Sequence, residues 1–175
     1  NTDSITTADT DNDGDIDIVA LSFDNSNVYV AVNPLKEGGN IDKPWETIIV
    51  LKSPGIHRDG ERIEIIDLDC NGFNDIIFNR GSPQKVHVLY NPARDIRNKW
   101  NVVEIGKHAG SDAHDVITAD LDQDGDLDII AASGDQTREG AVYWYEHPDK
   151  NSHEGNWKRY KISKRSANYG VLQIA

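Results

Sequence analysis

Short apolar runs, many of them β-branched, recur along the whole chain and are separated by polar segments rich in Asp, Asn, Gly and Pro. Runs of this length between turn residues are typical of β-strands rather than of helices. The pattern predicts three groups of four strands, at 4–8, 16–23, 28–32 and 46–51, at 63–66, 76–78, 86–90 and 102–105, and at 116–119, 129–132, 142–145 and 159–162. The same order of strands and turns therefore occurs three times.

This repetition predicts the architecture. Each group carries one tryptophan at the same phase, namely Trp45, Trp100 and Trp157. Four short antiparallel strands with periodic aromatic residues are typical of a propeller blade. We predict an all-β chain of three such blades within one propeller domain, at 1–58, 59–113 and 114–175, the last including the first strand of a following blade. Propellers have roughly four to eight blades, so further blades or other chains are expected to complete the ring.

An acidic segment of nine residues lies between the first and second predicted strands of every repeat, at 9–17, 67–75 and 120–128. Each copy has a carboxylate or a carboxamide at positions 1, 3, 5 and 9, and Gly at position 6. Alternating oxygen-bearing side chains around a Gly of positive φ form the first part of a calcium loop. Position 12, where the helical calcium hand has Glu, is Ala20, Phe78 or Ala131. The sequence therefore predicts a calcium loop set between strands.

The pattern assigns two or three structural Ca²⁺ ions. The predicted side-chain ligands are Asp9, Asp11, Asp13 and Asp17, then Asp67, Asp69, Asn71 and Asp75, then Asp120, Asp122, Asp124 and Asp128, with main-chain oxygens from Asp15, Phe73 and Asp126. The alternative is an acidic turn without metal. Three copies in one phase favour the metal, because crowded carboxylates repel one another unless a cation offsets them. Asn71 replaces a carboxylate, so the second site is expected to be the weakest.

Charge and composition narrow the function. The 175 residues carry a formal net charge of −12, and thirteen of the thirty acidic residues lie inside the three acidic segments. The charge is thus local, and neither a nucleic-acid footprint nor a membrane span is indicated. The single cysteine, Cys70, is interpreted as incidental, and the absence of Met suggests a processed product. Weak carboxylate loops fill at extracellular calcium levels, so we expect a secreted or periplasmic location.

The D-x-D-x-D-G-x-x-D segments, the I-x-x-A-D strand before the first of them at 5–9, the following D-I-I/V strand and the V-Y-W-Y-x-x-P strand at 142–148 resemble FG-GAP/VCBS-type repeats. This resemblance covers essentially the whole chain. It implies a calcium-stabilised β-propeller, commonly seven-bladed, as in integrin α heads, fungal and bacterial lectins, and secreted polysaccharide lyases. The copy at 67–75 departs from the pattern at Asn71 and at Phe73-Asn74.

Three functions remain open from the sequence. The first is a binding module, for carbohydrate or as a scaffold of a larger secreted protein, whose glycan or protein ligand sits at the His/Arg-rich end opposite the acidic segments. The second is a polysaccharide lyase acting on uronate polymers, with the candidates His114, His57, Arg58 and Tyr169. The third is an integrin-like adhesion head. Aromatic residues at regular blade spacing are interpreted as packing rather than as sugar platforms.

Overall fold

The computed structural model describes residues 2–22, 27–52, 62–80, 85–107, 113–133, 141–148 and 156–163. These residues form only β-structure. The strands are β1 (Thr2–Ala8), β2 (Asp17–Ser22), β3 (Val28–Val32), β4 (Glu46–Leu51), β5 (Ile63–Ile66), β6 (Asp75–Arg80), β7 (Lys85–Tyr90), β8 (Asn101–Lys107), β9 (Ala113–Ala119), β10 (Asp128–Ser133), β11 (Val142–Glu146) and β12 (Lys158–Lys161). Among the described residues there is no helix long and apolar enough to cross a membrane.

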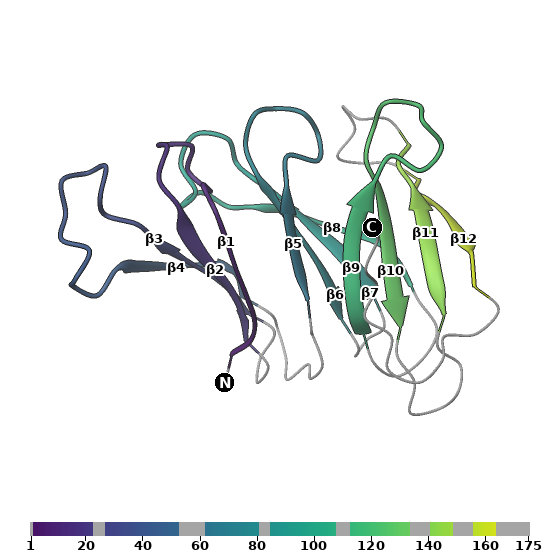
Figure 1. Ribbon diagram of the computed structural model, residues 1–175, viewed down its shortest axis with the longest axis horizontal. Helices are drawn as coiled ribbons and strands as arrows, with labels where there is room; N and C mark the ends of the chain where they lie inside the picture. The colour runs from purple at the N-terminus through teal and green to yellow at the C-terminus, as the bar shows by residue number, and fades with distance from the viewer. Residues whose placement is uncertain are drawn as a thin grey trace.

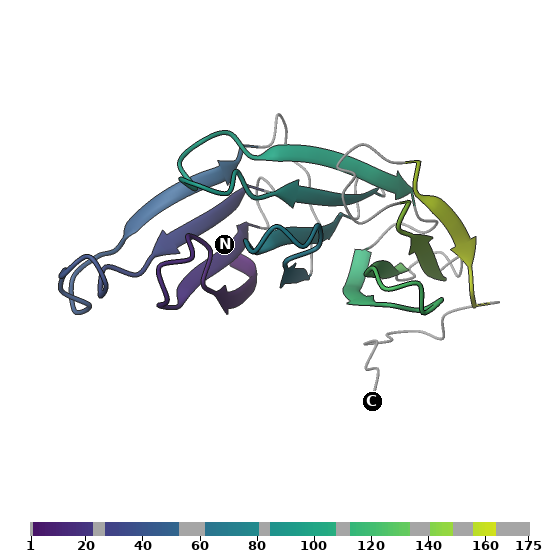
Figure 2. The same cartoon turned by 90° about the horizontal axis from the view of Figure 1, so that it is seen from above.

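The strands build three four-stranded antiparallel sheets, which we call sheet 1 (β1 to β4), sheet 2 (β5 to β8) and sheet 3 (β9 to β12). In each sheet the strands lie side by side in chain order, so every connection joins neighbours. The sheets follow one another along an arc, with β1, β5 and β9 on its concave side and β4, β8 and β12 on its convex side (Figures 1 and 2). The predicted all-β class, with three four-stranded antiparallel units of propeller-blade form, is confirmed.

One core lies between sheet 1 and sheet 2. Sheet 1 contributes Val19, Leu21 and Val30, and sheet 2 contributes Phe78 and Trp100, all of them buried. Strand β2 alternates between buried and half-buried positions because successive side chains of a strand point to opposite faces. Each such side chain contributes roughly 1.5–3 kcal/mol on burial, so this interface stabilises the pair of sheets.

A second core lies between sheet 2 and sheet 3. Here Ile77 and Val88 of sheet 2 pack with Val116 and Tyr145 of sheet 3. Strand β6 therefore buries Phe78 against sheet 1 and its neighbour Ile77 against sheet 3. A strand covered on both faces reads as a continuous apolar run, which explains the imperfect alternation of the sequence.

The approach of sheets 2 and 3 is close at Gly106. A Cβ atom added there would lie 2.7 Å from the Cε1 atom of Tyr145, so only glycine fits without a shift. The Tyr145 hydroxyl then donates a hydrogen bond of 3.0 Å to the main-chain oxygen of Lys107. This contact fixes the edge of β8 against β11.

Strand β9 is longer than the sequence predicts. Asp115, which we expected in a connecting loop, is a strand residue paired with Ala132, and its carboxylate is buried. A register shift between Ala132 and Ser133 allows the pairing to continue to Ala113. The apolar pattern missed this extension because His114 and Asp115 are polar. The strand predicted at 170–175 lies outside the described residues.

Candidate metal-binding loops

The three acidic segments occupy equivalent places in the fold. We call them loop 1 (9–17), loop 2 (67–75) and loop 3 (120–128). Each connects the first strand of its sheet to the second. All three lie along the same edge of the molecule, at the top of Figure 1. Any ions that they hold would therefore line one end of the molecule.

Two residues of left-handed backbone shape every loop. The glycine at position 6 has φ of 92° at Gly14, 90° at Gly72 and 96° at Gly125. Position 4 is also left-handed, with φ of 61° at Asn12, 58° at Cys70 and 63° at Gln123. Asn adopts this conformation more readily than other residues with a side chain, and its presence at Asn12 was the only sequence signal for it. Cys70 is exposed and takes the same conformation as its counterparts.

The aspartate at position 1 folds the loop over itself. Its two carboxylate oxygens accept hydrogen bonds from the main-chain N–H groups of positions 5 and 6. The bonds run to Asp9 from Asp13 (3.2 Å) and Gly14 (3.0 Å), to Asp67 from Asn71 (2.9 Å) and Gly72 (2.8 Å), and to Asp120 from Asp124 and Gly125 (both 3.2 Å). This carboxylate thus orders the loop backbone as well as facing the site.

The aspartate at position 9 connects the loop to the third strand. In loop 2, Asp75 accepts a hydrogen bond from the N–H of Leu68 (3.0 Å) and another from the N–H of Asn91 (2.8 Å), the residue after β7. Asp17 does the same for Thr10 (3.0 Å) and Asn33 (2.8 Å). These carboxylates are fully buried, so each holds two segments of its sheet together.

Loop 3 repeats that arrangement. Asp128 accepts hydrogen bonds from the N–H groups of Leu121 (3.1 Å) and His147 (2.9 Å). The sequence predicted position 9 only as a ligand and missed this anchoring role. The available signal was the Asn-Pro, Asn-Pro and His-Pro pairs that follow the third strand at one phase.

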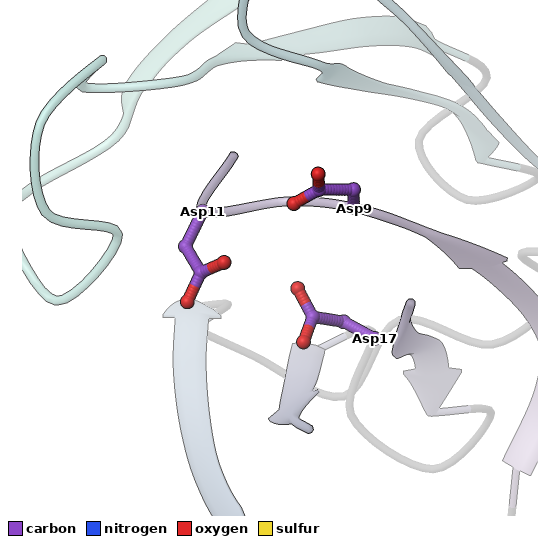
Figure 3. A group of neighbouring side chains, drawn as sticks. All are labelled: Asp9, Asp11 and Asp17. Atoms are coloured by element: carbon purple, nitrogen blue, oxygen red, sulfur yellow. The ribbon is translucent and has the colours of Figure 1, made fainter. Parts of the chain in front are cut away.

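Carboxylates converge in every loop. Each loop contains three carboxylates of which one oxygen per residue lies within 4.8 Å of the others. The sets are Asp9, Asp11 and Asp17 in loop 1, Asp67, Asp69 and Asp75 in loop 2, and Asp120, Asp122 and Asp124 in loop 3. Figure 3 shows the first set, with the three side chains directed towards a common space. A hard dication prefers such oxygen ligands. The donor set therefore fits calcium.

Position 5 takes part less uniformly. Asp13 lies outside the converging set of loop 1, whereas Asp124 belongs to that of loop 3. The side-chain oxygen of this residue accepts a hydrogen bond from the N–H two residues later, at 2.9 Å in loop 1 and 2.8 Å in loop 2. In loop 2 the Asn71 amide also donates to Asp69 at 3.1 Å. Loop 3 differs at position 9, since Asp128 is not among its three converging carboxylates.

Position 7 offers side-chain chemistry that the sequence did not indicate. Asp15 is buried, and one of its oxygens accepts a hydrogen bond from the N–H of Lys36 (3.0 Å). Asp126 lies 3.8 Å from the Nδ1 atom of His147. The predicted main-chain coordination by Asp15, Phe73 and Asp126 stays a prediction.

The electrostatics of the loops favour a cation. Burial, with a smaller effect of neighbouring carboxylates, raises the pKa of Asp11 to about 6, of Asp75 to about 7 and of Asp126 to about 6. Within the described residues, the buried oxygens Asp11 Oδ1, Asp15 Oδ1 and Asp126 Oδ1 have no hydrogen-bond partner. Carboxylate oxygens placed in this way gain most from a bound cation, which compensates both burial and repulsion.

A polar groove of about 450 Å³ lies beside loop 1. It is lined by Asp11 and Asp13 of the loop, by Lys36 from the turn after β3, and by Arg94 and Arg97 from the connection after β7. Sheets 1 and 2 therefore both contribute to it. Among the described residues, Lys36 and Arg94 form no ion pair, whereas Arg97 binds the Glu46 carboxylate through two of its nitrogens.

The opposite end shows less of the predicted site. Of the lyase candidates, His114 lies in β9 and is half-buried, while His57, Arg58 and Tyr169 lie outside the described residues. Arg62, which lies just before β5, pairs with the buried Asp115 at 3.2 Å. Within the described part of the chain, the His, Arg and Tyr side chains that a lyase needs are therefore not seen to converge.

Comparison with known protein families finds a match to part of the chain. The model of the FG-GAP-like repeat matches residues 67–131, which run from the start of loop 2 through loop 3 into β10. No curated protein matches the chain. The match covers two of the three acidic loops and supports the assignment of residues 67–131 as an FG-GAP-like repeat.

Proposed function

We propose that this chain is part of a calcium-stabilised, extracellular β-propeller that acts as a binding module. One observation carries the calcium part of the proposal. Three carboxylates converge at the equivalent place of three sheets, and loops 1 and 3 also hold buried carboxylate oxygens without a hydrogen-bond partner. Repulsion among these groups would oppose folding without a cation, so a cation at each loop would stabilise the sheet that carries it.

The positions of each loop have different roles. Position 1 orders the loop, and position 9 joins it to the residue after the third strand. Both would also face an ion in loops 1 and 2, whereas loop 3 would offer positions 1, 3 and 5. Position 3, which is Asp11, Asp69 or Asp122, would supply a further carboxylate ligand. A bound calcium ion would supply positive charge and fixed coordination. The hydrogen bonds from the backbone of each sheet to these aspartates support a structural role for the loops.

Calorimetric titration with calcium tests this proposal. We expect two or three sites, with the lowest affinity at loop 2, where Asn71 replaces a carboxylate. The variants Asp11→Asn, Asp69→Asn and Asp122→Asn should each remove or weaken one site, because each takes one negative charge from a converging set. Asp42→Asn, an exposed residue outside the loops, is the matched control and should leave the titration unchanged. A chain that binds no calcium would contradict the proposal.

For the ligand, we propose a carbohydrate, and the groove beside loop 1 supports this choice. Its volume of about 450 Å³ suits a small saccharide, since ligand sites span roughly 300–1,000 Å³. Its lining is mostly polar, which matches hydroxyl groups. A cation in loop 1 would offset Asp11 and Asp13. Because Arg97 pairs with Glu46 and Asp95, Lys36 and Arg94 would then be the cations of the lining that have no ion pair among the described residues, beside Glu37. An acidic saccharide is therefore favoured over a neutral one.

Binding of uronate oligosaccharides, measured by calorimetry in calcium and in chelator, tests the ligand. We expect binding only in calcium, and a loss of about tenfold in affinity for Lys36→Ala or Arg94→Ala, because a hydrogen bond to a charged group contributes about 1.5–3 kcal/mol. Lys43→Ala, which removes an exposed lysine that does not line the groove, should have no effect. Equal affinity for the variants and the parent chain would place the ligand elsewhere.

A further inference from the structure

A hydrogen-bonded bridge joins loop 1 of sheet 1 to loop 2 of sheet 2. Its centre is Asn91, the buried residue that follows β7. The Nδ2 group of Asn91 donates to the main-chain oxygen of Thr10 in loop 1 (2.8 Å) and to that of Asn74 in loop 2 (3.0 Å). The residues that it joins are more than sixty positions apart in the sequence, since Thr10 and Asn74 belong to different repeats.

The bridge ends on a converging carboxylate at each side. In loop 2, the N–H of Asn91 donates to Asp75 at 2.8 Å. In loop 1, Thr10 donates to Asp17 through both its N–H, at 3.0 Å, and its hydroxyl. Asp17 and Asp75 each belong to a converging set of carboxylates. A continuous path of hydrogen bonds therefore runs from one candidate metal site to the other through Asn91 and Thr10.

A second contact reinforces this path. The side chain of Asn74, at position 8 of loop 2, donates to the main-chain oxygen of Asp9 in loop 1 at 2.8 Å. Asp9 is itself a member of the first converging set. Thus Asn74 and Asn91 both hold backbone oxygens of loop 1, and the backbone of loop 1 is ordered from outside its own sheet.

The pair of asparagines that makes these bonds belongs to the second repeat, since the first repeat has Asn33 at the place of Asn91 but no donor at position 8, and the third repeat has neither. Position 8 is Ile16 in loop 1 and Leu127 in loop 3, and neither side chain donates a hydrogen bond. The counterpart of Asn91 in sheet 3 is His147, whose ring packs edge-on against Trp157 with centroids 4.4 Å apart. Loops 2 and 3 are therefore not joined by an asparagine pair of this kind.

We propose that Asn91, with Asn74, couples the cation sites of loops 1 and 2, so that filling one loop raises the affinity of the other, while loop 3 fills independently. This inference rests on the proposed calcium binding. Asp75, held by a cation, would fix the position of Asn91, which would in turn order Thr10 and Asp17 for a second ion. The second ion then has less loop to order, and this lowers its cost of binding.

Sheet 1 contains a closely matched control for Asn91. Asn33 makes the same local contacts, because its N–H donates to Asp17 (2.8 Å) and its Nδ2 group donates to the oxygen of Ile16 (3.0 Å). Both asparagines also accept a hydrogen bond from the N–H two residues later. Only Asn91 adds the bond to Thr10 of another sheet. A comparison of Asn33→Ala with Asn91→Ala therefore separates coupling from local loop stability.

The experiment is a double-mutant cycle read by calcium calorimetry. In a background where Asp122→Asn silences loop 3, the affinity of loop 2 is measured with loop 1 intact and with Asp11→Asn. We expect the loss of loop 1 to weaken loop 2 by about fivefold, the lower end of typical coupling. After Asn91→Ala the same loss should leave the affinity of loop 2 unchanged, whereas after Asn33→Ala the fivefold effect should persist.

Two further variants distinguish a loss of coupling from a loss of folding. Asn91→His and Asn74→Leu introduce residues that sheet 3 tolerates at the equivalent positions, His147 and Leu127. Each should reduce the coupling while the chain stays folded. Calcium binding with independent loops 1 and 2, or coupling that survives Asn91→Ala, or coupling that is lost equally in Asn33→Ala, would overturn this inference alone. Absence of calcium binding would overturn the proposed function together with it.

Discussion

Replacing Asp75 by alanine is expected to lower the free energy of unfolding by about 3 kcal/mol even in the absence of calcium, because two buried N–H groups then lose their acceptor. These groups belong to Leu68 and Asn91, at 3.0 and 2.8 Å from the two carboxylate oxygens. Each unsatisfied buried donor costs about 1–3 kcal/mol, and removal of the buried charge offsets part of that sum. Urea unfolding of Asp75→Ala in chelator, followed by tryptophan fluorescence, measures the effect.

The matched comparison is Asp122→Ala in loop 3. Asp122 is exposed, and slight desolvation together with neighbouring carboxylates raises its pKa, so its removal in chelator should relieve repulsion and leave stability unchanged or higher. In calcium the same variant should be less stable than the parent chain, because a ligand is lost. Equal destabilisation by Asp75→Ala and Asp122→Ala in chelator would show that position 9 acts as a ligand alone and does not anchor the sheet.

The difference between these aspartates marks what the sequence could and could not predict. Spacing alone identified Asp75 and Asp122 as members of one motif, because alternate positions of a tight loop face the same side. It could not separate them, because the anchoring of Asp75 depends on Asn91, which is distant in the sequence and is brought close only by the pairing of β6 with β7. A repeat predicts equivalent places along the chain, whereas the contact of Asp75 with the N–H of Asn91, which recurs for Asp17 and Asp128, follows from the pairing of the second and third strands of each sheet.

The tryptophans illustrate the same limit. Trp45 and Trp100 donate the same hydrogen bond to the main-chain oxygen four residues earlier, at 3.1 and 2.9 Å, as their common phase predicts. Trp100 is buried in the core between sheets 1 and 2, in agreement with the packing interpretation. Trp45 is only half-buried, on the outermost described sheet. Local sequence thus determines the turn, while the neighbouring sheet determines the burial.

Calcium should raise the melting temperature of the chain by an amount that depends on pH. At a free calcium concentration of about one hundred times the dissociation constant, each site stabilises the fold by about 2.7 kcal/mol, so three sites give about 8 kcal/mol. For a chain of this size that corresponds to a rise of about 20 °C in the melting temperature. Differential scanning calorimetry at pH 7.5, in calcium and in chelator, should show this difference.

The difference in melting temperature between the calcium-bound and the metal-free protein should shrink as the pH falls, because the two forms respond to pH with opposite signs. In chelator, Asp75, with a pKa near 7, and Asp11, with a pKa near 6, take up protons more readily in the folded chain than in the unfolded chain. Their stabilising contribution is complete below pH 4 and is lost as the pH rises through 6 to 7, so metal-free protein should melt higher at pH 5.5 than at pH 7.5. In calcium the same carboxylates must be ionised, so protons compete with the ion and the melting temperature should fall towards pH 5.5.

Surface ion pairs do not affect this comparison of the melting temperatures in calcium and in chelator. Hydrogen bonds from Arg97 lower the pKa of Glu46 and of Asp95, and hydrogen bonds from Lys158 and Tyr160 lower that of Glu146. A carboxyl group of lowered pKa loses its stabilising contribution only as the pH falls below its ordinary value near 4, outside the range of the experiment. Parallel curves in calcium and in chelator between pH 5.5 and 7.5 would therefore show that the buried loop carboxylates do not hold the ion.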